Sequence, residues 1–217
     1  MTKHFQRDMA AFTDDLLRLT AAVEDALANA IQAILARDPG LAAAVVEGDA
    51  AIDAREVRLE EDALKILALH APVARDLRYL IASIKIDNDL ERIADMAANI
   101  ARRALDLADC EPVTPPQGIE EMASRTRQMV RQAIHALVNR DPELARKVRQ
   151  EDDAVDRLQT LMLQELEDRM VGAAAEQVKA LLRWFGAVRN LERVSDLATN
   201  IAEDILYLIE GEIVRHR

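Results

Sequence analysis

The chain has 217 residues, of which half are hydrophobic and only 3% aromatic, and its formal net charge is −11 at pH 7. This acidity excludes nucleic-acid binding, which needs clustered basic residues, and disfavours adhesion to an anionic membrane surface. The single cysteine, Cys110, leaves no internal disulfide and favours a reducing compartment. Neither an apolar signal segment nor an uncharged apolar run of about 18 residues is present. We therefore expect a cytoplasmic protein that meets membranes only through its partners.

Apolar residues recur at helical spacing through six segments; prolines mark four of the five breaks between them, and Gly172 marks the last. Asp38-Pro39 and Asp141-Pro142 each have the pattern of an N-cap residue followed by proline at the first helical position. Alanine and leucine dominate the composition, which favours close-packed helices over sheets. The expected helices are 3–36, 39–69, 73–109, 118–138, 142–170 and 174–213.

The second half of the chain repeats the first. Residues 89–101 and 190–202 are identical at eight of 13 positions, and Arg37-Asp38-Pro39 returns as Arg140-Asp141-Pro142. Three long helices with short loops must run up, down and up in each half. The sequence therefore predicts an all-α fold of two tandem, pseudo-symmetric three-helix bundles.

A proline-rich stretch at 111–118 separates the two copies, because three prolines within it prevent the helix from continuing. We expect the first three-helix repeat at 1–110, the linker at 111–118 and the second repeat at 119–217.

Paired carboxylates at positions i and i+4 occur twice in each half. Residues with this spacing lie one above the other on a helix, so each pair forms part of an acidic stripe. The apolar positions of the same helices point elsewhere. The candidate ligands are Asp49, Asp53, Glu91, Asp95, Asp152, Asp156, Glu192 and Asp196. The first copy is the more acidic, because its stripe continues through Glu56 and Glu60, where the second copy has Gln159 and Leu163.

Stacked carboxylates on an exposed helix repel each other by a few tenths of a kcal/mol, so four such pairs need an explanation. One is divalent metal binding, because carboxylate oxygens on adjacent helices could share ions. The other is salt bridging by arginines that lie close in sequence, and spacing alone leaves both open. These arginines are Arg55, Arg92, Arg157 and Arg193.

Histidine spacing narrows the choice of metal. Ferritin-like di-iron sites use Glu-x-x-His, but Glu91 is followed at +3 by Ala94 and Glu192 by Ser195. We therefore expect an all-oxygen shell, which suits Mg, Mn, Ca or clustered Fe and not Zn held by histidine or thiolate. The chain also lacks phosphate-binding glycine loops and a Gly-x-Ser-x-Gly motif, so no catalytic or cofactor-binding residue is expected.

Three segments carry a family resemblance. The first repeat contains Pro72-Val73-Ala74-Arg75-Asp76-Leu77-Arg78 and Asp89-Leu90-Glu91-Arg92-Ile93-Ala94-Asp95, and the second contains Asn190-Leu191-Glu192-Arg193-Val194-Ser195-Asp196. With these motifs the chain resembles the PhoU family, cytoplasmic regulators of bacterial phosphate uptake, over essentially its whole length. That family usually has glycine where this chain has Ala94 and Ser195, but both residues are small enough for close helix packing.

The resemblance implies two three-helix bundles with divalent metal ions, Fe, Zn, Mn or Mg, clustered at the Glu/Asp-x-x-x-Asp motifs. It implies a homodimer or larger assembly that regulates phosphate uptake and represses the phosphate-starvation response. The implied partners are the ATPase of the phosphate ABC transporter and a sensor histidine kinase. Two alternatives stay open: a carboxylate-ligated metalloenzyme acting on phosphate esters, which would use two ions, and a metal-free helical adaptor.

Overall fold

The computed structural model describes residues 3–210, which form six helices and no strand. The predicted helices are all present, with ends that agree to within one residue, except that 211–213 of the last one lie outside the described residues. The helices are α1 (Lys3–Ala36), α2 (Pro39–His70), α3 (Ala74–Ala108), α4 (Ile119–Asn139), α5 (Pro142–Met170) and α6 (Ala175–Glu210).

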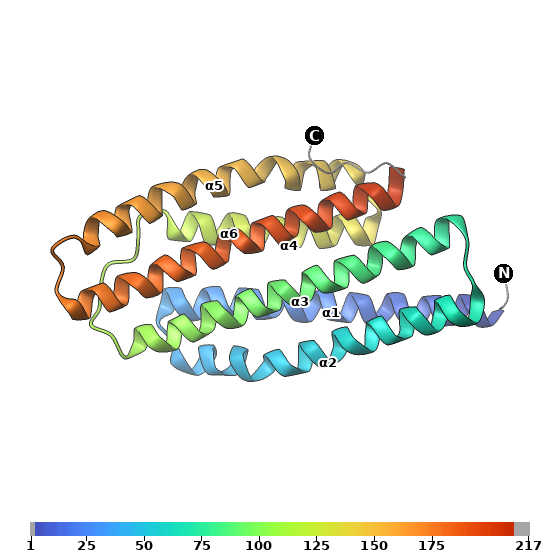
Figure 1. The fold of residues 1–217 in the computed structure, drawn as a ribbon, viewed down its shortest axis with the longest axis horizontal. Helices are drawn as coiled ribbons and strands as arrows, with labels where there is room; N and C mark the ends of the chain where they lie inside the picture. The colour runs from blue at the N-terminus through green and yellow to red at the C-terminus, as the bar shows by residue number, and fades with distance from the viewer. Residues whose placement is uncertain (1–2, 211–217) are drawn as a thin grey trace.

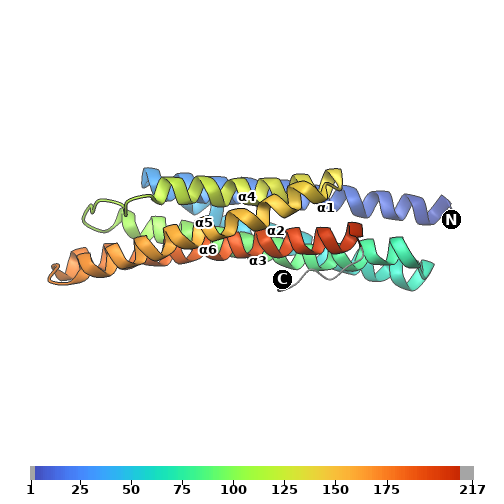
Figure 2. The same ribbon diagram turned by 90° about the horizontal axis from the view of Figure 1, so that it is seen from above.

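The helices form two groups of three, α1 to α3 and α4 to α6, and consecutive helices are antiparallel (Figure 1). The main contact between the groups is between α3 and α6, which lie side by side in both views, and α1 also contacts α4 (Figures 1 and 2). The all-α, two-bundle architecture predicted from the repeated sequence is confirmed.

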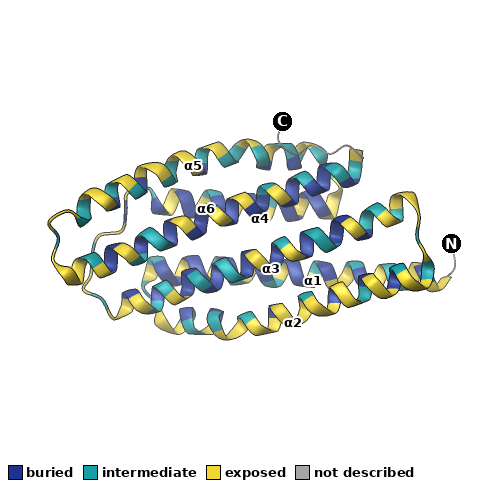
Figure 3. Ribbon diagram, viewed as in Figure 1, coloured by how far each residue is buried: buried dark blue, intermediate teal, exposed yellow. Residues whose placement is uncertain are grey.

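The core runs along the centre of the molecule, where α3 and α6 carry the longest series of buried residues (Figure 3). Alanine supplies many of these positions on α3, including Ala97 and Ala101, so the backbones can approach closely. Trp184 on α6 is only 2% exposed and packs in this core. By contrast, α2 and α5 bury few residues and form outer helices. Each acidic stripe therefore lies where an outer helix meets a central one.

Helix α1 is long and apolar enough to cross a membrane by length and composition. Its apolar side chains, including Phe12, Leu16 and Leu27, are buried in the bundle against the neighbouring helices. This packing is that of a core helix in a helical bundle.

The two Arg-Asp-Pro segments form equivalent turns. Arg37 and Arg140 follow the last residues of α1 and α4 in the left-handed conformation, with φ of 52° and 51°. After the first of these, Asp38 Oδ1 accepts a hydrogen bond from the Leu41 backbone N–H at 3.0 Å, and Pro39 begins α2. The predicted N-cap is confirmed, since the carboxylate satisfies a backbone donor that the helix leaves unpaired.

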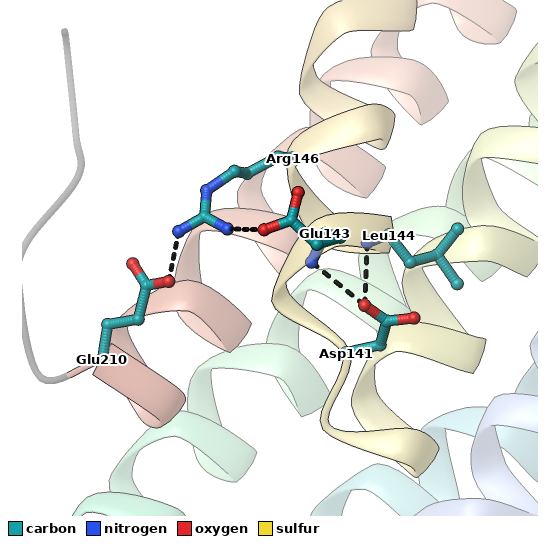
Figure 4. A network of polar contacts seen from close by, with 5 residues as sticks. All are labelled: Asp141, Glu143, Leu144, Arg146 and Glu210. Atoms are coloured by element: carbon teal, nitrogen blue, oxygen red, sulfur yellow. Dashed lines mark hydrogen bonds and ion pairs between the residues drawn. The ribbon is translucent and has the colours of Figure 1, made fainter.

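The second turn is capped in the same way and is also tied to the far end of the chain (Figure 4). Asp141 Oδ1 accepts from the backbone N–H groups of Glu143 and Leu144 at 3.0 and 3.1 Å. Arg146, one turn into α5, donates to the carboxylates of Glu143 and Glu210. The start of α5 is therefore fixed to the end of α6.

The segment between α3 and α4 is fastened near its start and at its middle. Arg37 donates to the carbonyl oxygen of Cys110 at 2.9 Å, and Arg169 of α5 donates to that of Thr114 at 2.7 Å. Side chains from both halves thus hold an irregular backbone whose own carbonyl groups have no helical partner.

Candidate metal centres

The eight candidate carboxylates lie on facing helices. Those on α2 face those on α3, and those on α5 face those on α6, as the electrostatic coupling between them shows. The duplicated sequence motif is therefore a duplicated structural cluster at equivalent places in the two halves. That these residues bind metal stays a prediction.

The cluster in the second half is the tighter one. One carboxylate oxygen from each of Asp152, Asp156 and Asp196 lies within 4.8 Å of the others. Burial raises the pKa of Asp152 to about 6, with further contributions from the charges of Asp156 and Asp196. Oδ1 of Asp152 is buried without a hydrogen bond of good geometry among the described residues, and the hydroxyl of Thr199 on α6 acts on this carboxylate by lowering its pKa. Three converging oxygens and one buried acceptor fit a hard divalent cation.

Glu192 adds a fourth carboxylate to this cluster. Burial raises its pKa, followed by the charges of Asp196 and Asp156. Arg193 and a hydrogen bond from Gln159 act in the opposite direction. The charges of Asp196 and Asp156 affect the pKa of Glu192 more than these two groups do, so the site favours an added proton or cation.

In the first half, Asp49 and Glu91 occupy the corresponding positions. Burial raises the pKa of both, and the charges of Asp53 and Asp95 raise them further. Among the described residues, three oxygens converge as closely as 4.8 Å only in the second half. One reason is Arg102 of α3, whose guanidinium lies 3.4 Å from Asp49 and holds part of the first cluster in an ion pair.

The arginines expected to neutralise the stripes act only in part. Arg92 pairs with Asp89 at 3.4 Å, and that aspartate is not one of the eight. Arg193 lowers the pKa of Glu192 and of Asp196 through its charge. Across residues 3–210, the ion pair of Arg102 with Asp49 is the only one within 4.0 Å that involves a candidate ligand. Salt bridging thus accounts for few of the eight carboxylates.

Arg102 has a counterpart of opposite charge in the second half. The equivalent position on α6 is Glu203, and Arg149 of α5 lies 3.3 Å from it. Arg102–Asp49 and Arg149–Glu203 thus each join an outer helix to a central one, with the arginine on the central helix in the first half and on the outer helix in the second. Sequence spacing did not indicate these pairs, because they depend on how the helices pack.

Sequence analysis also missed Asp87 on α3. Its side chain is 1% exposed, and neither of its carboxylate oxygens has a hydrogen-bond partner among the described residues. Burial raises its pKa to about 8, with contributions from the charges of Glu56, Glu60 and Glu91. Asp87 lies one helical turn before Glu91 in the sequence, and this spacing indicates that it extends the acidic stripe. The second copy has Val188 at this position, so a motif defined by acids that both copies share does not include Asp87.

The small residues inside the two motifs are buried. Ala94 and Ser195 lie in the core, and Ser195 Oγ donates to the Glu192 carbonyl oxygen at 2.6 Å. With no room for a larger side chain, these positions keep the central helix close to its neighbours while the acids face the outer helix.

The comparisons with known proteins agree with the repeated architecture. The family model for the PhoU domain matches twice, at residues 16–104 and 119–205. The chain is 37% identical to a phosphate-specific transport system accessory protein PhoU homolog from Pseudomonas aeruginosa, over 100% of this chain and 91% of that protein. A relative with the same name from Caulobacter vibrioides is 35% identical, with 98% and 94% covered.

Solved structures show the same fold. The crystal structure of PhoU from Pseudomonas aeruginosa matches with a TM-score of 0.90 and 35% identity, covering 96% of this chain and 100% of that one. The phosphate transport system regulatory protein PhoU from Streptococcus pneumoniae matches with a TM-score of 0.88 and 25% identity, covering 97% and 99%. From these matches over nearly the whole length, the chain belongs to the PhoU family.

Proposed function

We propose that this chain is a non-enzymatic accessory protein of phosphate transport, which regulates phosphate uptake and represses phosphate-starvation signalling. The observation that carries the proposal is the match of both halves to relatives named as accessory proteins of the phosphate-specific transport system. The relatives are matched over nearly their full length, so the whole of the accessory protein is compared and not a single shared module.

The proposed partners are the ATPase of the phosphate ABC transporter and a sensor histidine kinase, met in the cytoplasm, with the chain acting as a homodimer. Support comes from the shape of the molecule: long rigid helices present broad surfaces, and α2 and α5 lie on the outside with many exposed residues (Figure 3). Such surfaces suit protein recognition, because a specific interface needs about 800 Å² on each partner.

The proposed metal ligands are the eight motif carboxylates, four in each half. A bound divalent ion would supply positive charge and oxygen coordination between facing helices. Asp49 and Asp53 of the outer helix would then be held against α3 instead of being repelled by it. The ion would thereby set the position of the surface that α2 presents, and the equivalent ligands on α5 would do the same in the second half.

A regulatory role is favoured over hydrolysis of phosphate esters by the exposure of the second-half cluster. Asp156 and Asp196 are exposed, so their carboxylates lie at the surface. Metal-assisted hydrolysis needs a water-excluding cavity around the ions, which an open helix surface does not provide.

A complementation experiment tests the function. The gene is deleted from its host, and a starvation-promoter reporter is measured at high phosphate with the wild-type chain or with Glu91→Gln/Asp95→Asn. The wild type should silence the reporter and the double variant should relieve silencing. An exposed pair outside the clusters, Glu61→Gln/Glu167→Gln, is the control and should behave as the wild type.

Pull-downs with the transporter ATPase and the kinase, with and without Mn²⁺ and phosphate, then test contact directly. We expect both partners to be retained in at least one of these conditions. A wild-type chain that leaves the reporter active and retains neither partner would contradict the proposal.

A further inference from the structure

We propose that a cavity between the two halves of the chain binds a phosphate group, carried either by inorganic phosphate or by a nucleotide. The cavity lies at the end of the molecule where α3 begins and α6 ends, beside the turn from α4 to α5 (Figure 1). Its volume is about 540 Å³, inside the range of roughly 300 to 1,000 Å³ that small-molecule sites occupy. This inference goes beyond the proposed function, because it adds a ligand that neither the partners nor the motif carboxylates account for.

Three arginines from both halves line the cavity, in a chain whose formal net charge is −11. Arg75 and Arg78 lie near the start of α3, and Arg140 lies in the turn after α4. Arginine stays charged at any physiological pH, and its planar fork of N–H donors matches the oxygens of a phosphate group. Three fixed positive charges at one cavity therefore favour an anion with several oxygens.

The side chains of these three arginines have no polar partner among residues 3–210, neither an ion pair within 4.0 Å nor a hydrogen-bond acceptor. Nε of Arg78 is buried as well as unpaired. Other interhelical arginines of the chain pair with carboxylates, as Arg146 does with Glu210. Buried donors in proteins normally have an acceptor, and a bound oxyanion would supply one with charge-assisted hydrogen bonds.

The duplication supplies an internal comparison for Arg140. Its equivalent in the first half, Arg37, donates to the carbonyl oxygens of Leu107 and Cys110. Arg140 lies instead over the ring of Tyr79, with its guanidinium carbon 5.7 Å from the ring centre. The same turn therefore carries an arginine whose N–H groups are used by the protein in one half and left for a ligand in the other.

Helix α1 holds the ring that supports Arg140. The hydroxyl of Tyr79 lies 3.0 Å from Thr13 Oγ1, and Thr13 Oγ1 donates to the carbonyl oxygen of Met9 at 2.9 Å. Since a threonine hydroxyl has one proton, Tyr79 is the donor to Thr13. Phe12 packs edge-on against the same ring, with 6.5 Å between the ring centres. The cavity wall is thus fixed before a ligand arrives, which reduces the cost of binding.

Two aspartates, Asp14 and Asp76, also line the cavity and make it selective. A carboxylate only accepts hydrogen bonds, so it repels an oxyanion without protons and binds one that carries a proton. Inorganic phosphate keeps a proton near neutral pH and sulfate has none, while a nucleotide offers its ribose hydroxyl groups to the same acceptors. Leu208 and Ile209 give the cavity an apolar side that the base of a nucleotide could contact. This lining favours phosphate compounds over sulfate.

The test is titration calorimetry of the purified full chain in chelator, with inorganic phosphate, AMP and sulfate as separate probes. Chelator keeps metal away from the motif carboxylates, so any phosphate that binds is not bound to an ion there. We expect phosphate or AMP to bind the wild type, and Arg78→Gln and Arg140→Gln each to weaken that binding about tenfold or more. The control is Arg189→Gln, an exposed arginine of α6 outside the cavity, which should keep the wild-type affinity.

The two phosphate probes identify the source of the phosphate group. Tighter binding of AMP assigns the cavity to a nucleotide, and tighter binding of phosphate assigns it to the free ion. Because Arg140 is exposed and Arg78 is half-buried, both variants should keep the wild-type melting temperature. Any of three results would overturn the proposal: neither phosphate nor AMP binds, both arginine variants bind as the wild type does, or sulfate binds as tightly as phosphate.

The calorimetry uses the chain without its partners, so its outcome is separate from that of the reporter experiment. A wild-type chain that binds neither probe and still silences the reporter would remove the site and leave the proposed function standing. A chain that binds phosphate through Arg78 and Arg140 but does not silence the reporter would do the reverse.

Discussion

Replacing Asp152 by asparagine should stabilise the metal-free protein. Its carboxylate lies in a group of three whose oxygens are within 4.8 Å of one another, and burial raises its pKa to about 6. Asparagine has nearly the same shape but no charge, so the substitution removes the repulsion and leaves the packing unchanged. The matched control is Glu167→Gln, an exposed acid on the same helix whose charge is not among those that act on Asp152.

The size and pH dependence of the effect follow from the pKa. The rise from 3.8 to about 6 corresponds to at most about 3 kcal/mol of lost stability above pH 6, at about 1.4 kcal/mol per pH unit. Because the Asp152 side chain is partly exposed, solvent screening reduces this to about 1–2 kcal/mol. Since the folded state keeps its proton where the unfolded state has lost it, this penalty is absent below pH 4, grows between pH 4 and about 6, and stays constant above.

The assay is urea unfolding followed by circular dichroism, in chelator, near pH 4 and near pH 7. Asp152→Asn should be more stable than the wild type by about 1–2 kcal/mol near pH 7 and equal to it near pH 4. With saturating Mn²⁺ near pH 7 the order should reverse, because only the wild type keeps the full ligand set. A variant that is no more stable than the wild type in chelator near pH 7 would refute the reasoning.

Four other substitutions test the helix caps, the packing and the charges. Asp38→Ala and Asp141→Ala should each lower the unfolding free energy by about 1 kcal/mol in urea titrations, because each removes a helix N-cap. Trp184→Ala should cost about 3–5 kcal/mol in the same assay, because it opens a large cavity in the core. Arg102→Gln should tighten Mn²⁺ binding to the first half in calorimetry, because it releases Asp49 from its ion pair, and unchanged affinity would contradict this.

The helices could be predicted from the sequence because their determinants are local. The N-cap aspartates followed by proline begin α2 and α5, and the prolines at 112–116 end the first repeat. Fold class followed from the same information, since two sets of three long segments with short connections have few ways to bury their apolar faces.

Part of the candidate site could not be predicted because it depends on tertiary contacts. Arg102 of α3 and Asp49 of α2 are 53 residues apart in the sequence, and no spacing rule connects them. The burial of Asp87 depends on the helices that pack around it, although its place one turn before Glu91 could have indicated a longer stripe. A motif defined by what is repeated also omits whatever belongs to one copy alone.

The most direct test of metal binding by the duplicated acidic clusters is the metal content of protein purified without chelator. The wild-type chain should carry divalent metal in stoichiometric amounts in both halves, and Glu91→Gln/Asp95→Asn/Glu192→Gln/Asp196→Asn should lose most of it while remaining folded. A wild-type chain that is free of metal, takes up none from solution and still silences the starvation reporter would contradict the account.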